Sequence, residues 1–223
     1  MSEFEPPLLS LPFPPAPDPD LVAAARKRPK PGERRVQILQ TLATMLEQPG
    51  MERVTTAALA ARLEVSEAAL YRHFASKAQM FEGLIEFIEQ TVFSLINQII
   101  TRTDADADPS AGPRQAGQII AMLLQFAEKN PGMARVMVGD ALVFENDRLQ
   151  QRMNQLFDKI ESTFRQTLRG AALASGSVTP SVDTQVHAAV LTAFVVGRLQ
   201  RFTRSSFKRL PSDHLEACLL HLL

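Results

Sequence analysis

Residues 54–77, VTTAALAARLEVSEAALYRHFASK, predict two short helices joined by a tight turn. Thr55 and Thr56 can cap the first helix and Ser66 can cap the second, because their side-chain oxygens accept hydrogen bonds from free backbone N–H groups. Glu64 and Val65 form the turn between the two helices. This arrangement is typical of a helix-turn-helix, whose second helix fits the major groove of DNA.

The second helix has an inner and an outer face. Ala69, Leu70 and Phe74 fall on the inner face at helical spacing. The outer face carries Glu67, Ala68, Tyr71, Arg72 and His73. Any pair of packed helices would have such caps and leucines, but the run LYRHF at 70–74, followed by Ser76 and Lys77, favours DNA binding.

We expect two kinds of DNA contact from this segment. Groups that can bind phosphates belong to Thr55, Thr56, Tyr71, His73 and Lys77. Side chains that can read bases belong to Ser66, Glu67, Ala68 and Arg72. Glu67 can accept from a cytosine amino group, Ala68 can touch a thymine methyl group, and Arg72 can pair with guanine. His73 fits a capping or packing role as well as it fits a phosphate contact. We expect the shape of the DNA to contribute to recognition together with these contacts.

VSEAALYRHFASK, residues 65–77, resembles the signature of the TetR family of helix-turn-helix regulators. The resemblance implies an all-α homodimer, in which a long helix joins an N-terminal three-helix DNA-binding domain to a C-terminal helical dimerisation bundle. Two residues depart from the family pattern, since Glu64 stands where Gly is common and Ala75 where Pro is frequent. A positive φ at Glu64 would cost about 1 kcal/mol, because a side chain is disfavoured there.

The rest of the chain narrows the resemblance to one branch of this family. MFEGLIEFIE (80–89), NPGMARVMVGDALVFENDRLQQRMNQLFDKIE (130–161) and RFTRSSFK (201–208) resemble nucleoid-occlusion factors, which inhibit bacterial cell division when bound to DNA. The resemblance extends over residues 33–210 and leaves the first thirty residues uncovered.

This branch implies a second partner, the C-terminal tail of the division GTPase FtsZ, bound in a groove between the long linker helix and the next helix. The matching positions are Phe87, Leu95, Met122, Leu123, Gln125, Phe126, Lys129 and Asn130. A hydrophobic groove with a cationic rim suits an extended apolar peptide with acidic neighbours. Leu95 and Gln125 differ from the family's residues, and Phe87 fits the protein core as well as the groove.

Prolines and charges divide the chain into regions. Residues 1–31 hold nine of the fifteen prolines, which predicts a disordered leader. Its basic arm at 26–30 would either bind DNA phosphates or only increase the solubility of the protein. We assign residues 32–77 to the DNA-binding domain and residues 78–223 to the dimerisation and partner-binding domain. The chain has no net charge, but residues 26–77 hold ten Lys or Arg against five Asp or Glu, so positive charge lies where DNA is expected.

Helical spacing of apolar residues, interrupted by Pro and Gly, predicts the remaining elements. The expected helices are 33–48, with Val36 on its apolar face, 76–102, 113–129, 133–138, 140–174, 181–206 and 212–223. The segment TDADADPSAG at 103–112 predicts a loop.

Small residues in the last two helices favour a homodimer interface there. Ala188, Ala189, Ala193 and Gly197 allow close helix crossing, although packing within one subunit would use the same residues.

A basic face follows in the first of these two helices. Arg198, Arg201 and Arg204 recur every three residues, and Lys208 and Arg209 come after them. Complementing the helix C-terminus explains this face, and a partner-binding role is the alternative.

The sequence offers no catalytic or metal-binding pattern. Its four His residues lack Cys or Glu-x-x-His spacing, and no Gly-x-Ser-x-Gly or Gly-rich phosphate loop is present, so we expect neither an enzyme nor a cofactor. Cys218 is the only Cys, which excludes an intrachain disulfide, and we expect its thiol to be buried. No stretch approaches the roughly 18–20 apolar residues that span a bilayer. We therefore expect a cytoplasmic protein without a membrane partner, and the resemblance implies that it is associated with the nucleoid.

Three functions can be weighed against these observations. A DNA-dependent division inhibitor would bind double-stranded DNA as a homodimer and couple that binding to capture of FtsZ. A ligand-responsive repressor would share the fold and DNA contacts, but the chain has no Trp and its only Tyr is in the DNA-reading segment, which disfavours a small-molecule pocket. A helical scaffold without a DNA role would leave the positive charge of residues 26–77 unexplained.

Overall fold

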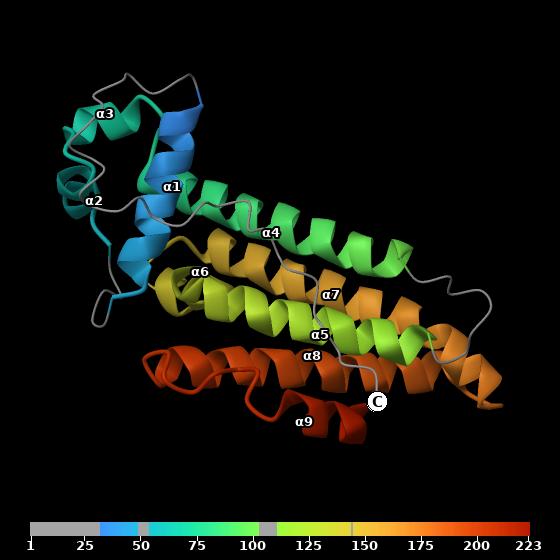
Figure 1. Ribbon diagram of the computed structural model, residues 1–223. Coiled ribbons are helices and arrows are strands. Elements are labelled where there is room, and N and C mark those ends of the chain that lie inside the picture. Colours follow the sequence, from blue (N-terminus) through green and yellow to red (C-terminus); the bar gives the residue numbers. More distant parts are fainter. Residues whose placement is uncertain (1–31, 49–53, 103–110, 144) are drawn as a thin grey trace.

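The computed structural model describes residues 32–48, 54–102, 111–143 and 145–223, and every regular element within them is helical. The elements are α1 (Glu33–Leu46), α2 (Thr56–Arg62), α3 (Glu67–Tyr71), α4 (Lys77–Thr101), α5 (Ala111–Lys129), α6 (Pro131–Met137), the 3-10 helix η2 (Asp140–Leu142), α7 (Asp147–Ala174), α8 (Pro180–Arg204) and α9 (Leu215–Leu222). Figure 1 shows α1–α3 gathered at one end of α4, and the later long helices running beside α4 as a bundle. The all-α fold class is therefore confirmed.

The first three helices, which we call the head, pack around the beginning of α4. Leu59, Leu70 and Phe74 are each 1% exposed and join the buried side of α1 in one apolar core. Glu64, in the turn between α2 and α3, has a φ of 54°, so it adopts the left-handed backbone that favours glycine. Val36 is 47% exposed, so its predicted place on the apolar face is wrong. It lies in the first turn of α1, before the buried stripe begins at Ile38.

Helix α4 joins the head to the rest of the protein, which we call the body. Ser76 caps it by accepting a hydrogen bond from the backbone N–H of Gln79 at 3.2 Å. Its buried stripe consists of Met80, Phe81, Leu84, Ile85, Ile88, Thr91, Val92 and Ile96. Leu95 and Ile99 are half-buried against the core. One continuous helix thus packs against both α1 and the helices of the body.

The centre of the body is formed by α5, α7 and α8, with α7 and α8 packed along each other. The close approach of α5 to α7 depends on Gly112, because a Cβ atom there would lie 2.3 Å from the carbonyl oxygen of Thr167. A larger residue would force the two helices apart.

Several helix starts differ from the sequence prediction. Helix α7 begins at Asp147, seven residues later than expected. Gly139 has a φ of 84°, and the 3-10 helix η2 follows it. Asn146 then caps α7 by accepting a hydrogen bond from the backbone N–H of Arg148 at 2.9 Å. Helices α5 and α6 each begin two residues earlier than expected, and the first residue of α6 is a proline, which is favoured at that position.

The last helix also begins later than predicted. It starts at Leu215, after His214 with a φ of 56°, and none of its residues is buried. Cys218 is half-buried rather than buried, because it lies on this superficial helix. Its sulfur accepts a hydrogen bond from Arg198 at 2.9 Å.

A second contact between head and body joins α1 to α6. Gly132 makes it possible, because a Cβ atom there would lie 1.9 Å from the carbonyl oxygen of Ala43. The buried side chain of Arg135 donates a hydrogen bond to the carbonyl oxygen of Gln48 at 3.1 Å. Burial raises the pKa of Glu47, and a hydrogen bond with the main chain of Gly132 lowers it in part.

Some predictions fall outside the described part of the chain: the proline-rich leader with its basic arm, and residues 103–110 of the expected loop. Within the described part, no helix is long and apolar enough to cross a membrane. The same residues contain no group of three or more His, Cys, Asp or Glu side chains that could hold a metal ion.

Candidate DNA-binding and partner-binding surfaces

The two helices of the expected helix-turn-helix are capped as the sequence predicts. The Thr55 side chain accepts from the backbone N–H of Ala58 at 3.1 Å, and the Ser66 side chain accepts from that of Ala69 at 3.3 Å. Of the nine residues assigned to DNA contacts, seven are exposed: Thr55, Ser66, Glu67, Ala68, Tyr71, Arg72 and His73. Helix α3 therefore presents its polar side to solvent while Leu70 and Phe74 anchor it.

Two of the DNA-contact candidates bind each other. The Thr56 hydroxyl, at the start of α2, donates to the Glu67 carboxylate, at the start of α3, at 2.6 Å. This bond fixes the first turns of the two helices against each other. Oxygen lone pairs of the Glu67 carboxylate remain for a cytosine amino group, because an ionised carboxylate has about four acceptor sites.

Arg35 of α1 is a residue that the sequence analysis did not single out. Its Nη1 donates to the carbonyl oxygen of His73 at 2.7 Å, and its guanidinium lies 4.1 Å from the centre of the Phe74 ring. Both contacts hold the end of α3 onto α1, so Arg35 orients the reading helix. No local pattern identifies it, because its partners are 38 or more residues away.

Lys77 is half-buried and is paired within the protein. Its ammonium binds the carboxylate of Glu145, which precedes α7, and lies 5.7 Å from the Phe81 ring centre. Lys77 therefore ties the start of α4 to the body in addition to lying beside the predicted DNA surface.

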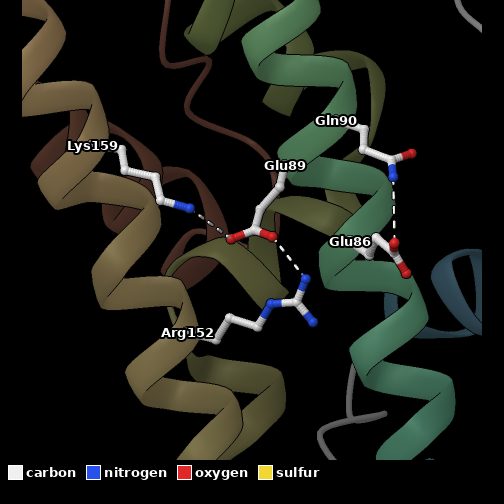
Figure 2. Close-up of polar contacts among 5 residues, drawn as sticks. All are labelled: Glu86, Glu89, Gln90, Arg152 and Lys159. Carbon is white, nitrogen blue, oxygen red and sulfur yellow. Dashed lines mark hydrogen bonds and ion pairs between the residues drawn. The ribbon is translucent and has the colours of Figure 1, made fainter.

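A second ionic cluster ties the middle of α4 to α7. Glu89 accepts from Arg152 at 2.8 Å and lies 3.9 Å from the ammonium of Lys159, while Gln90 donates to Glu86 along the outer side of α4 (Figure 2). The side chain of Glu89 is 15% exposed, so its charge is largely removed from water and depends on these two cations. Together with the Lys77 contact, this cluster joins α4 to the region around α7 at two points.

The positions that resemble the FtsZ groove lie on α4 and at the end of α5. Leu123 and Phe126 are 0% and 1% exposed and Met122 is buried, so they support this surface from below. Phe87, Leu95, Gln125 and Asn130 are half-buried, and Lys129 is exposed at the end of α5. The amide of Asn130 donates to the carbonyl oxygen of Phe126 at 2.8 Å, which ends the helix. The surface available to a partner is thus narrower than the eight residues imply.

An apolar face of α8 is directed to solvent in the isolated subunit. Val182, Val186 and Val190 are 59%, 59% and 47% exposed, and Ala189 and Ala193 are also exposed. Ala188 is instead fully buried in the body, as are Leu191, Val195 and Leu199. The two sides of α8 therefore have separate uses: one packs on the body, and the other has the composition of a subunit interface.

Helix α9 lies on the outside of α5 and α8. A Cβ atom at Gly117 of α5 would lie 3.2 Å from the side chain of Leu223, and His187 of α8 bonds the carbonyl oxygen of Leu222 at 2.5 Å. Leu220 of α9 is 85% exposed, so the last helix also presents an apolar side chain to solvent.

Comparison with known families matches both parts of the chain. Residues 38–84 match the family described as "Bacterial regulatory proteins, tetR family", and residues 114–222 match the SlmA-like "Tetracyclin repressor-like, C-terminal domain". The chain is similar to the nucleoid occlusion factor SlmA of Photobacterium profundum, with 50% identity over 84% of this chain and 92% of the relative. It is 51% identical to the protein of the same name from Vibrio cholerae, over 82% of this chain and 90% of the relative.

Solved structures share the fold. The fatty acid degradation regulator FadR from Bacillus halodurans aligns with a TM-score of 0.67 at 14% identity, covering 88% of this chain and 96% of that one. A transcriptional regulator from Rhodococcus aligns with a TM-score of 0.64 at 21% identity, covering 84% and 92%. The matched families consist of regulators, in agreement with the expectation that the chain is not an enzyme.

Proposed function

The chain belongs to the family of the nucleoid occlusion factor SlmA, within the TetR-type regulators, and we propose that it couples DNA binding to inhibition of cell division. Bound to chromosomal sites, it would bind FtsZ and prevent assembly of the division ring over the nucleoid. The identity of about half of all aligned residues, extending through both head and body, carries this proposal. The head alone would fit any regulator of the TetR type.

We propose that the exposed side of α3 enters the major groove. Arg72 has no charged partner among the described residues, so its guanidinium is available for guanine or phosphate. Ser66, Glu67 and Ala68 lie one turn earlier on the same helix and supply weaker base contacts. Thr55, Thr56, Tyr71 and His73 then position the head on the phosphate backbone.

The homodimer is proposed to form through α8 and α9. The exposed valines and alanines of α8, together with Leu220, would be buried between two copies. Small side chains along this face allow two α8 helices to approach closely. Dimerisation would place two heads on one DNA duplex, as the symmetry of such regulators requires.

The FtsZ tail is proposed to bind along α4 and the end of α5. Phe87 and Leu95 are half-buried there, and Lys129 supplies an exposed cation at the end of α5. A peptide with apolar and acidic residues has complementary chemistry. The anchoring of α4 at Lys77 and Glu89 supports a coupling between DNA and peptide, because any change in the orientation of the head is passed along α4.

A transcriptional repressor that a small ligand releases from DNA is the second candidate. It shares the head and the fold, and the solved structures of the same fold include transcriptional regulators. The relatives that are about 50% identical to this chain are named nucleoid occlusion factors, which favours nucleoid occlusion over the repressor function.

The DNA assignment is tested with Arg72→Ala. We expect affinity for DNA selected by the wild-type protein to fall about 5- to 150-fold for each half-site, which corresponds to the roughly 1–3 kcal/mol of one good base contact. Affinity for random duplex should also fall, but less. Fluorescence anisotropy measures both, with Arg169→Ala on the exposed side of α7 as the control. Unchanged binding by Arg72→Ala would refute the assignment.

A further inference from the structure

Four cations gather at the C-terminal end of α8. Arg201 and Arg204 belong to its last turn, and Lys208 and Arg209 belong to the segment that follows. All four side chains are exposed, and within the described residues none of them has an ion-pair partner. Arg198 is different, because it donates to the carbonyl oxygen of Asp213 at 3.0 Å and to Cys218, and so holds α9 in place.

The segment after α8 is anchored to the body. Ser206 and Phe207 have φ values of 52° and 63°, which non-glycine residues adopt rarely. The Phe207 ring lies 5.1 Å from that of Phe202 in an edge-to-face contact, and the guanidinium of Arg135 lies 4.9 Å from its centre. Lys208 and Arg209 are therefore carried on a fixed turn, which lowers the entropy cost of binding an anion.

The two arginines continue the apolar face of α8. Val182, Val186, Val190 and Ala193 of that face, continued by Gly197, follow one another at spacings of four, four, three and four residues. Arg201 and Arg204 follow at four and three, so they lie on the same side of the helix. A Cβ atom at Gly197 would meet no atom within 4 Å, which leaves room for a second helix directly beside the arginines.

Two heads on one DNA duplex require a two-fold axis that runs along the molecule from the heads to the far end, and a dimer with this axis would bring both sets of cations together at one end of the interface. Figure 1 shows that α8 ends at the same end of the molecule as the head. The combined cluster would therefore lie between the two heads. Like charges in that position repel each other, and a bound anion would relieve this repulsion.

We propose that Arg201, Arg204, Lys208 and Arg209 of both subunits form a symmetric site for the DNA phosphate backbone between the two half-sites. The site rests on the proposed dimer through α8. It contributes affinity without reading bases, because phosphates carry no sequence information. DNA is favoured over an acidic peptide because the cluster is continuous with the end of the molecule that carries the heads.

The salt dependence of DNA binding tests this site. Each phosphate contact contributes about 0.9 to the slope of log affinity against log salt. Arg201→Ala with Arg204→Ala removes four cations from a dimer, so we expect the slope to become shallower by at least about 2. Affinity should fall about tenfold at moderate salt, equally for a wild-type-selected duplex and a mixed-sequence duplex of roughly 30 base pairs.

A second measurement locates the contact on DNA. Neutral methylphosphonate linkages would replace phosphates at the centre of the selected duplex. The wild-type protein should lose affinity for this DNA, and the double variant should lose less, because only Lys208 and Arg209 remain at its site. The charge-matched control is Arg165→Ala with Arg169→Ala, which removes two exposed arginines from α7 and should leave the slope unchanged. Circular dichroism and sedimentation would verify that each variant is folded and dimeric.

The outcomes separate this site from the proposed function. A wild-type protein that fails to dimerise or to bind DNA would contradict the proposed function itself. A wild-type dimer that binds DNA with the same slope and affinity as the double variant would overturn the central phosphate site alone. If the double variant kept the wild-type slope and DNA affinity but lost affinity for an FtsZ tail peptide, the cluster would be a peptide site. The DNA proposal would be rejected in that case too.

Discussion

At the scale of single residues, the reading helix is oriented by side chains that do not themselves touch DNA in the proposed complex. Arg35 binds the carbonyl oxygen of His73 and stacks on Phe74, whereas its neighbour Arg34 donates to Gln37 on the same helix and to no other described residue. The two arginines therefore form a matched pair: each contributes one positive charge, but Arg35 alone holds α3.

Arg35→Ala is expected to weaken binding to selected DNA about tenfold, because a lost charge-assisted hydrogen bond is worth roughly 1.5 kcal/mol or more. Arg34→Ala should cause a smaller loss that is the same for selected and random DNA. Anisotropy titrations with both duplexes measure the difference. Equal losses in the two variants would show that Arg35 acts through charge alone.

Glu47 gives a prediction that depends on pH. Because burial raises its pKa in the folded protein, the unfolded chain loses this proton at lower pH than the folded protein does. The stability contributed by Glu47 is therefore highest near or below the ordinary pKa of 4.5 and falls as pH rises through the folded-state value.

Glu47→Gln should therefore raise the Tm slightly at neutral pH and leave it unchanged near pH 4.5. The glutamine oxygen can still accept a hydrogen bond from the main chain of Gly132, so the packing is kept. Thermal unfolding at the two pH values measures the effect. The same Tm difference at both values would contradict the explanation by burial.

At the scale of helices, the contact between α1 and α6 decides how firmly the head is held. Gly132→Ala places a methyl group where the carbonyl oxygen of Ala43 lies, so one helix must move. We expect the free energy of unfolding to fall by about 1–3 kcal/mol, as for other overpacked sites. Urea unfolding measures the loss.

Gly170→Ala is the matched control, because its new methyl group would meet no atom within 4 Å. Within α7 it should leave stability unchanged or raise it by about 0.5–1 kcal/mol through helix propensity. A loss of stability in this control equal to that of Gly132→Ala would show that the effect does not come from the contact with α1.

The helices also show what the sequence could predict. The cap at Ser66 and the exposed side of α3 depend on residues within a few positions of each other, and both are confirmed. The start of α7 was missed because Gly139 and Asn146 set it through backbone geometry and capping rather than through apolar spacing.

Contacts between distant segments lay beyond prediction. Arg35 with His73, Lys77 with Glu145 and Glu89 with Arg152 each join residues at least 38 positions apart. The burial of Leu123 and Phe126 was missed for the same reason. The side of α5 that faces inward depends on packing against distant helices of the body. The sequence therefore predicted candidate surfaces, but not the residues that hold them in place.

At the scale of the whole molecule, the account requires that two ligands share one rigid body. The head binds DNA, α4 passes between the two surfaces, and the ion pairs at Lys77 and Glu89 hold α4 to the rest of the body. If DNA stabilises the arrangement that binds the peptide, the peptide must strengthen DNA binding by the same factor.

The most direct test is the affinity of the full-length protein for a synthetic FtsZ C-terminal tail peptide, measured with and without the selected DNA duplex. We expect DNA to tighten peptide binding at least about fivefold, within the usual range of coupling between two sites. Lys129→Glu should weaken peptide binding while DNA affinity is kept, and Arg169→Glu should change neither. Failure of the wild-type protein to bind the peptide, with DNA or without it, would contradict the proposed coupling and favour the ligand-responsive repressor.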